Sequence, residues 1–178
     1  MEQIIIKRAS LEDAVALAHL AERTFRDTFT EDDNTTDMEL HCAKSFGAEI
    51  QQQEIQHPNY VTFLATIANQ LVAFAQVRLH SPKECVVANH PTELYRFYVS
   101  QEWHGRGVAQ QMMDQVFSTA AHTGADYIWL GVWEQNPRAI AFYRKYGFDV
   151  VGEHVFQFGN DPQRDLIMVT QVKQSRVD

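Results

Sequence analysis

Apolar and polar residues alternate with a helical period in the first third of the chain. Apolar side chains recur at three- and four-residue steps over residues 14–25, which is the spacing of an amphipathic helix. Ser10 and Asp13 precede this stripe at the spacing of an N-terminal capping box. Residues 36–56 continue the helical period less regularly, and Gly47 is expected to interrupt them.

Strand-like segments stand before and after these helices. Residues 3–8 predict a short first strand. Segments 60–67 and 71–79 are rich in β-branched and aromatic residues and flank Asn69-Gln70, which predicts a hairpin. After a loop at 80–92, residues 93–99 predict a further strand.

The rest of the chain alternates between the two periods. Apolar residues four apart predict a helix that starts at Val108. Residues 126–133 predict a strand, and Asn136, Pro137 and Gly147 stand where an N-cap, a first helical residue and a C-terminal glycine bracket a short helix. Two closing strands are predicted at 148–158 and 164–172.

This order predicts one α/β (α+β) domain with a mixed sheet over residues 1–178. A length of 178 residues and a hydrophobic content of 45% suit one domain with a sizeable core.

Charge and apolar run length narrow the class of function. The net charge is −8, which argues against nucleic-acid binding through a basic face and favours a cationic small substrate. The longest apolar runs have five residues (71–75 and 139–143), whereas a membrane helix needs about 20. We therefore expect no contact with nucleic acid or membrane.

Cysteine and histidine spacing bears on compartment and metals. The two cysteines, Cys42 and Cys85, lack C-x-x-C spacing, and the first eight residues do not have the order of a signal peptide, so a cytoplasmic location is expected. The eight histidines do not stand at metal-ligand spacing, so no metal site is expected.

The segment from His104 to Gln110 carries the first candidate chemistry. It joins a strand to a helix and contains Gly105 and Gly107, which allow a ligand to approach the backbone closely. Amides at the start of a helix suit a diphosphate, and Arg106 and His104 can add positive charge. A simple helix cap is the alternative. A Walker loop is absent, and Gln110 stands where a dinucleotide-binding fingerprint has its third glycine.

A second segment, residues 129–148, completes a resemblance. Together the two segments resemble the GNAT superfamily of acetyl-coenzyme A-dependent N-acetyltransferases. The downstream family pattern matches at every position, and the loop pattern matches at Gly107 and Ala109 but has His104 in place of Gln or Arg. The downstream matches are Asn136, Ala139, Phe142, Tyr143, Lys145, Gly147 and Phe148. Segments 24–29, 129–134 and 154–168 are similar to the PaiA-type bacterial spermidine/spermine acetyltransferases.

The resemblance implies a fold and a co-substrate. The GNAT fold has a mixed, centrally splayed sheet of about seven strands with about four helices, and Gly131 would suit a bend or bulge at the splay. The co-substrate is acetyl-CoA, with no metal. The residues implied to bind it are Phe97, Tyr98 and Val99 by pairing of the strand backbone, His104, Gly105, Arg106, Gly107, Val108, Ala109 and Gln110 in the loop, and Asn136, Tyr143 and Lys145 downstream.

The reaction also needs a base and an acid. An alkylammonium has a pKa of about 10.4, so its deprotonation at pH 7 costs roughly 4.6 kcal/mol. Glu93 is the first candidate for the base and Glu134 the second, the alternative being that each is a solvated glutamate at a strand end. The resemblance implies that Tyr143 protonates the leaving thiolate, while Phe142 is expected to fill the core.

The acceptor is less closely defined. Phe25 and Phe29, with the acidic residues Asp27, Glu31, Asp32 and Asp33, could hold a polyamine, or could form a solvated acidic loop. A polyamine is the leading acceptor. The alternatives are a protein N-terminus, an amino acid, an aminoglycoside, or an acyl-CoA sensing module with little turnover. A homodimer formed at an edge strand near the C-terminus is a further arrangement that the sequence allows.

Overall fold

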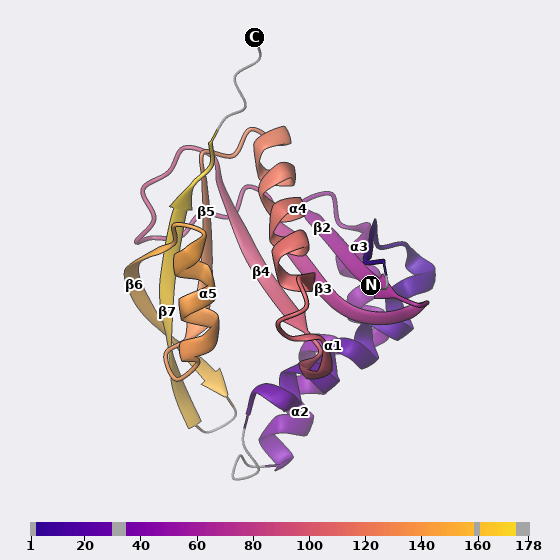
Figure 1. The fold of residues 1–178 in the computed structure, drawn as a ribbon. Helices are drawn as coiled ribbons and strands as arrows, with labels where there is room; N and C mark the ends of the chain where they lie inside the picture. Colours follow the sequence, from indigo (N-terminus) through magenta and orange to yellow (C-terminus); the bar gives the residue numbers. More distant parts are fainter. Residues whose placement is uncertain (1–2, 30–34, 159–160, 174–178) are drawn as a thin grey trace. The chain divides into compact units, whose positions relative to one another are not determined.

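A computed structural model describes residues 3–29, 35–158 and 161–173. They form a seven-stranded mixed sheet in the order β1-β2-β3-β4-β5-β7-β6, with five α-helices among the described residues. The predicted fold class is confirmed. Contacts divide the chain into two compact units, residues 1–77 with 96–115 and residues 78–95 with 116–178, and Figure 1 labels most of the elements of both.

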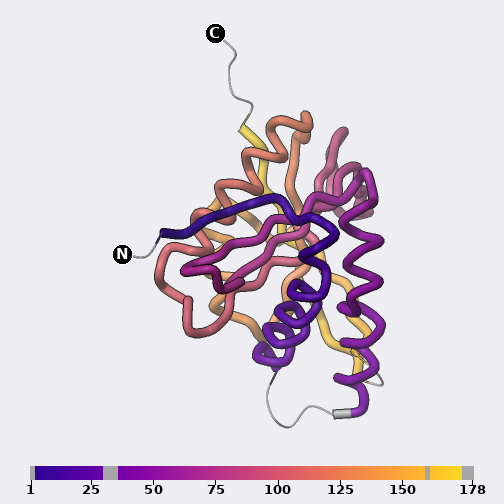
Figure 2. Tube along the Cα trace, turned by 90° about the vertical axis from the view of Figure 1, so that its right-hand side faces the viewer, coloured from indigo at the N-terminus to yellow at the C-terminus, as the bar shows by residue number. Residues whose placement is uncertain are grey.

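The helices of the first unit begin and end close to where the sequence predicts. Helix α1 (Ala14–Thr28) follows a 3₁₀ turn. The Ser10 amide donates to Asp13 Oδ2 at 2.8 Å, which completes the predicted capping box. Helices α2 (Thr35–Phe46) and α3 (Ala48–Gln56) meet at Gly47, as expected. Figure 2 shows the two following one another as one helical run.

The predicted hairpin is present and is shifted by one residue. Strand β1 (Ile5–Arg8) pairs antiparallel with β2 (Tyr60–Ile67), and β3 (Gln70–Arg78) follows. The turn consists of Ala68 and Asn69, at φ of +47° and +63°, the left-handed conformation that a tight two-residue hairpin requires.

Two elements cross between the units. Strand β4 (Pro91–Val99) begins two residues before the predicted strand, because proline is tolerated at the first position of a strand. Helix α4 (Val108–His122) begins where predicted. Met112, Met113 and Val116 on this helix are fully buried.

The second unit contains β5 (Tyr127–Trp133), α5 (Pro137–Lys145), β6 (Asp149–Phe158) and β7 (Asp161–Gln171). Strand β4 pairs in parallel with β5 over three positions, Pro91–Glu93 with Tyr127–Trp129. Helix α5 lies against β7 (Figure 1), where a Cβ at Gly147 would be 3.2 Å from Thr170 Oγ1.

The bulge expected at Gly131 lies elsewhere. Gly131 pairs with Ile167 in an unbroken antiparallel ladder between β5 and β7. The irregularity is in β6, between Val150 and Gly152. The last strand, β7, lies inside the sheet, so the edge available to a second copy near the C-terminus is β6.

Within the described ranges, no helix is long and apolar enough to cross a membrane.

Candidate functional site

The loop before α4 has the backbone conformation that the glycine pattern predicts. Gly105 and Gly107 have φ of +74° and +85°, which strains any residue with a side chain. A Cβ built at either position meets no atom within 4 Å. The two glycines therefore present open backbone on this side of the loop.

The first amides of helix α4, like those of any helix, need hydrogen-bond acceptors from outside the helix. The Gln111 amide donates to the Gly107 carbonyl at 3.2 Å, and the amides of Val108, Ala109 and Gln110 precede this first helical turn. Such amides have no intrahelical acceptor and lie at the positive end of the helix dipole. This arrangement suits an anion such as a diphosphate.

His104 and Arg106 have neighbours that the sequence did not predict. His104 Nε2 donates to the Val99 carbonyl at 2.7 Å, so this nitrogen carries the proton and a phosphate contact would have to come from Nδ1. The exposed Arg106 guanidinium lies 5.1 Å from the centre of the Trp103 ring.

Strand residues Phe97, Tyr98 and Val99 are half-buried. The Tyr98 ring stacks on Phe74 with centroids 5.5 Å apart. His104 ties the Val99 carbonyl to the loop. A hydrogen bond from the His104 side chain to the Val99 carbonyl therefore links the loop to the end of the strand.

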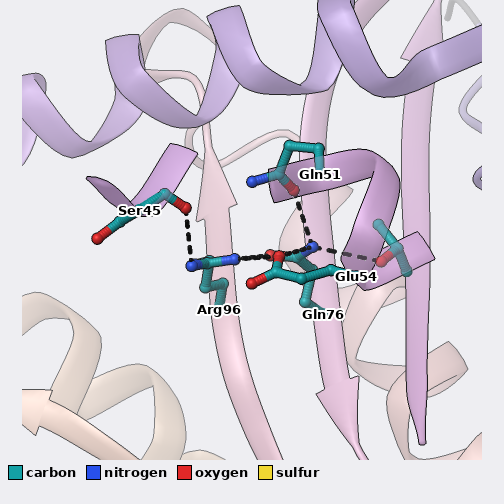
Figure 3. A network of polar contacts seen from close by, with 6 residues as sticks. Ser45, Gln51, Glu54, Gln76 and Arg96 are labelled. Atoms are coloured by element: carbon teal, nitrogen blue, oxygen red, sulfur yellow. Dashed lines mark hydrogen bonds and ion pairs between the residues drawn. The ribbon is translucent and has the colours of Figure 1, made fainter. Parts of the chain in front are cut away.

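A buried polar network anchors β4 just before these residues (Figure 3). Arg96 donates to Glu54 Oε2 at 2.6 Å, to Gln76 Oε1 at 2.7 Å and to the Ser45 carbonyl at 3.0 Å. Gln76 in turn donates to Gln51 Oε1 at 3.0 Å. Sequence reasoning missed this network, although an arginine within an apolar strand is a signal that a buried partner exists.

Asn136 caps α5 as predicted. Its Oδ1 accepts the Ala139 amide at 3.1 Å, which leaves the donor side of the amide group for a ligand. Lys145 is exposed at the other end of this helix.

The expected placement of the aromatic pair on α5 is wrong. Tyr143 is the buried residue, 8% exposed, while Phe142 is half-buried. The Tyr143 ring makes edge contacts with Phe142 and Phe148, each with centroids 5.7 Å apart. The turn after α5 brings Phe148 back to Tyr143, because the Phe148 amide donates to the Tyr143 carbonyl at 3.2 Å.

Both predicted base candidates are engaged with arginine. Glu93, 8% exposed, accepts from Ser81 Oγ at 2.9 Å and lies 3.2 Å from Arg78 Nη1. Glu134 accepts from Arg164 Nε at 2.7 Å. Each carboxylate therefore already has a counter-ion.

The aromatic part of the predicted amine site is a cluster on the first unit. Phe29 packs on Phe25 with centroids 4.8 Å apart, and Phe25 also contacts His41. The Asp27 carbonyl accepts from Gln101 Nε2 at 3.2 Å. Glu31, Asp32 and Asp33 lie outside the described residues.

The second unit brings together residues of the PaiA-like segments 129–134 and 154–168 to which the sequence analysis assigned no catalytic role. Asp165 on β7 pairs across the ladder with His154 on β6, and Gly131 on β5 lies beside both side chains. Burial raises the pKa of Asp165 to about 6, against the opposing charge of Lys83. Burial and then Lys83 lower the pKa of His154. No short-range sequence pattern links these positions.

Across the part of the chain that is described, no three His, Cys, Asp or Glu side chains gather so as to hold a metal ion.

The mixed sheet and the open glycine loop before α4 suit a protein that binds a phosphate-bearing ligand. Residues 16–148 match the Acetyltransferase (GNAT) family, and the chain belongs to that family of N-acetyltransferases.

A curated relative bears the same N-acetyltransferase description, and solved structures share the fold. An uncharacterised N-acetyltransferase of Lactobacillus delbrueckii subsp. lactis is 25% identical, over 94% of this chain and 97% of its own. The PaiA N-acetyltransferase of Thermoplasma acidophilum, solved with coenzyme A, has a TM-score of 0.76 at 21% identity and covers 95% of this chain and 99% of its own. An acetyltransferase of Salmonella typhimurium, solved with acetyl-CoA, has a TM-score of 0.67 at 17% identity and covers 99% of this chain and 98% of its own.

Proposed function

We propose that this protein transfers an acetyl group from acetyl-CoA directly to the primary amine of a polyamine such as spermidine or spermine. The observation that carries the co-substrate is the loop at Gly105 and Gly107, with its open backbone before the dipole of α4. The solved structures of similar fold that hold coenzyme A or acetyl-CoA support the same assignment.

The residues of the loop and strand have separable tasks in this proposal. The loop amides hold the diphosphate, and Arg106 adds charge from an exposed position. The backbone of Phe97–Val99 pairs with the pantetheine arm as an added strand would. A backbone amide of Tyr98 or Val99 donates to the thioester oxygen as it becomes negative.

We also assign contacts with the carrier to residues of α5. Asn136 keeps its amide NH₂ for the arm, since its oxygen caps the helix. Lys145 is exposed and able to reach the adenosine phosphates. The Tyr143 hydroxyl donates a proton to the departing thiolate.

A polyamine is the leading acceptor for two reasons. The net charge of −8 favours cationic substrates. Sequence segments resemble PaiA-type acetyltransferases, and a PaiA structure is among those with a similar fold. Location in the cytoplasm and pairing of two copies through β6 remain predictions of the same proposal.

Calorimetric titration with acetyl-CoA, followed by a screen of amine acceptors that measures thiol release, tests the proposal. We expect saturable binding, and turnover of spermidine and spermine at least tenfold faster in kcat/KM than that of amino acids, peptides or an aminoglycoside. Equal weak rates for all acceptors would remove the polyamine. Absence of acetyl-CoA binding would remove acetyl transfer itself.

A further inference from the structure

We propose that Asp165 is the carboxylate that binds the acceptor amine above Gly131 and takes its proton during acetyl transfer. This inference rests on the proposed function. It replaces Glu93 and Glu134 in the role of base with a residue to which the sequence analysis gave no catalytic role.

The sheet register places the carboxylate over an open point of β5. Asp165 pairs with Trp133 on one side and His154 on the other. Gly131 lies two residues before Trp133, on the same face of the sheet. A Cβ at Gly131 would lie 3.5 Å from Asp165 Oδ2 and 3.3 Å from His154 Cε1.

Gly131 is exposed although Leu130 and Val132 on either side are buried. The missing side chain therefore leaves solvent-open backbone beside the carboxylate and the imidazole. The need for glycine here comes from these two neighbours, since the strand itself is regular.

The polar atoms beside Gly131 lack partners. Among the described residues, His154 Nδ1 is buried with no hydrogen-bond partner, and the half-buried Asp165 carboxylate makes no hydrogen bond or ion pair. Buried polar atoms are nearly always paired. A carboxylate is an acceptor only, and an amine supplies the N–H donor that the Asp165 carboxylate lacks.

The other base candidates differ in this respect. Glu93 is paired with Arg78, and Glu134 with Arg164. An arginine partner stabilises the charged carboxylate and makes it a weaker base. Asp165 is half-buried without such a partner.

The charged groups around Asp165 come from three elements. Lys83, in the loop before β4, lies with its ammonium 5.5 Å from the centre of the Trp129 ring, and its charge acts on both Asp165 and His154. His154 faces Asp165 from β6. Arg164, next to Asp165 on β7, points to Glu134 and Glu153 instead.

Lys83 also bears on the acceptor. A neighbouring cation disfavours the charged form of an amine. Lys83 therefore favours the free-base form of an amine held by Asp165, which is the form that attacks.

The chemical step balances without a further reactant. The lone pair of the neutral amine forms the C–N bond to the thioester carbon, and the nitrogen, now positive, gives one proton to the Asp165 carboxylate. The C–S bond breaks with its electron pair on sulfur, and the thiolate takes a proton from Tyr143. Asp165 then releases its proton to solvent and Tyr143 regains one, so the products are the amide, coenzyme A and one proton per ammonium consumed.

The ionisation of Asp165 supports this role. A base works best with a pKa close to the working pH, and burial raises the pKa of Asp165 to about 6.

The test is Asp165→Asn in the full chain, with Asp149→Asn as the matched control. Asp149 is an exposed carboxylate on β6, so the control removes the same charge from the same unit. We expect Asp165→Asn to lower kcat with spermidine by about 100-fold or more while the Kd for acetyl-CoA changes less than twofold. Asp149→Asn should leave both unchanged.

The pH profile identifies the base. Wild-type kcat should rise with pH through an apparent pKa near 6, and Asp165→Asn should lack this rise. His154→Gln should keep it. Lys83→Met should move it to higher pH, because Lys83 lowers the pKa of Asp165.

The inference is overturned if Asp165→Asn keeps the kcat of the wild type. It is also overturned if His154→Gln loses the rise of kcat with pH while Asp165→Asn keeps it. Either result leaves acetyl transfer standing. Calorimetry with spermidine in the absence of acetyl-CoA separates the two proposals. Should the wild type bind spermidine but show no turnover, weaker binding by Asp165→Asn supports the amine site although acetyl transfer fails. Equal binding by the variant overturns the amine site as well.

Discussion

At the scale of single residues, Asp165 is a group whose charge costs stability. Its pKa is about 6 in the folded chain against an ordinary 3.8, and burial is the cause. The folded state therefore holds this proton to a higher pH than the unfolded state does, and stability declines as pH rises from about 4 to 6. We expect Asp165→Asn to be more stable than wild type by about 1 kcal/mol at pH 7.5, a value reduced from the full shift because the group is only half-buried.

Urea denaturation at pH 7.5 and pH 4 measures this difference. It should be several-fold smaller at pH 4, where Asp165 is protonated in the folded state and close to half-protonated in the unfolded state. Asp149→Asn serves as control and should show no comparable gain. A loss of stability in Asp165→Asn at pH 7.5 would mean that the carboxylate makes a favourable contact.

Tyr143 gives a second prediction at this scale. The Tyr143 ring is buried against Phe142 and Phe148, so Tyr143→Phe keeps its packing and removes the hydroxyl alone. We expect kcat to fall by about 10- to 100-fold with an unchanged Kd for acetyl-CoA. The control is Tyr146→Phe, whose half-buried ring stacks on Phe117 at 6.1 Å. Equal kcat in wild type and Tyr143→Phe would exclude the hydroxyl as proton donor.

Burial of individual residues was the hardest feature to predict from sequence. The helical period located α5, but Phe142 and Tyr143 are adjacent, and which one is buried depends on the return of Phe148 after the helix. Gly131 resembled a bulge residue because its cause, the side chains of His154 and Asp165, lies more than 20 positions away. Contacts across strands leave no local pattern.

At the scale of elements, the loop before α4 joins backbone strain to function. Gly107 has φ of +85° with open space at its Cβ position, so Gly107→Ala should fold with a cost of about 1 kcal/mol. We expect it to weaken acetyl-CoA binding about tenfold or more, because the methyl group and any shift of the loop displace the amides.

Gly124→Ala is the control for that substitution. Gly124 has φ of +76° and equally open space, so the same loss of stability is expected with no change in the Kd for acetyl-CoA. Thermal unfolding and calorimetry on both variants separate strain from binding. Equal affinity for Gly107→Ala and wild type would contradict the loop assignment.

Helix α3 is tied to β3 and β4 by the network around Arg96. Arg96 and Glu54 side chains are 8% and 13% exposed, so Arg96→Met leaves a nearly buried carboxylate without its charge partner. We expect a loss of about 3 kcal/mol, and Arg96→Met with Glu54→Gln should lose less than Arg96→Met alone. Arg26→Met, which removes an exposed pair with Glu22, should change stability by less than about 0.5 kcal/mol.

Urea denaturation of these variants checks the prediction. If Arg96→Met cost no more than Arg26→Met, the network would be of no importance for stability.

Elements themselves were predictable because their signals are local: the Ser10–Asp13 box, Gly47 and the Asn136 cap all act where the sequence places them. The ends of strands were less predictable. Strand β7 begins at Asp161, before the predicted start at residue 164, because it pairs there with β6.

At the scale of the whole molecule, the order of elements was sufficient to predict the fold class. The strand order β5-β7-β6, which puts the last strand inside the sheet, was not predictable. Local periods show that a strand exists but contain no information on its neighbours. The division into two units falls within β4 and α4, so no linker composition marks it.

The net charge of −8 makes a prediction that involves the whole chain. A polycationic acceptor is attracted by the summed field, and salt shortens the reach of that field to about 10 Å at 0.1 M. We expect the KM for spermidine to rise several-fold between about 20 and 300 mM NaCl, with kcat nearly constant. The KM for acetyl-CoA, an anion, should stay level or fall.

The charge of the acceptor supplies the control for this experiment. An amine acceptor of zero net charge, assayed over the same salt range, should show little change in KM because the field does not attract it. If spermidine and the neutral acceptor responded alike, the effect would be one of salt on the protein in general. A salt-independent KM for spermidine would show that short-range contacts such as those of Asp165 dominate acceptor binding, and the argument from net charge to a cationic substrate would then lose its basis.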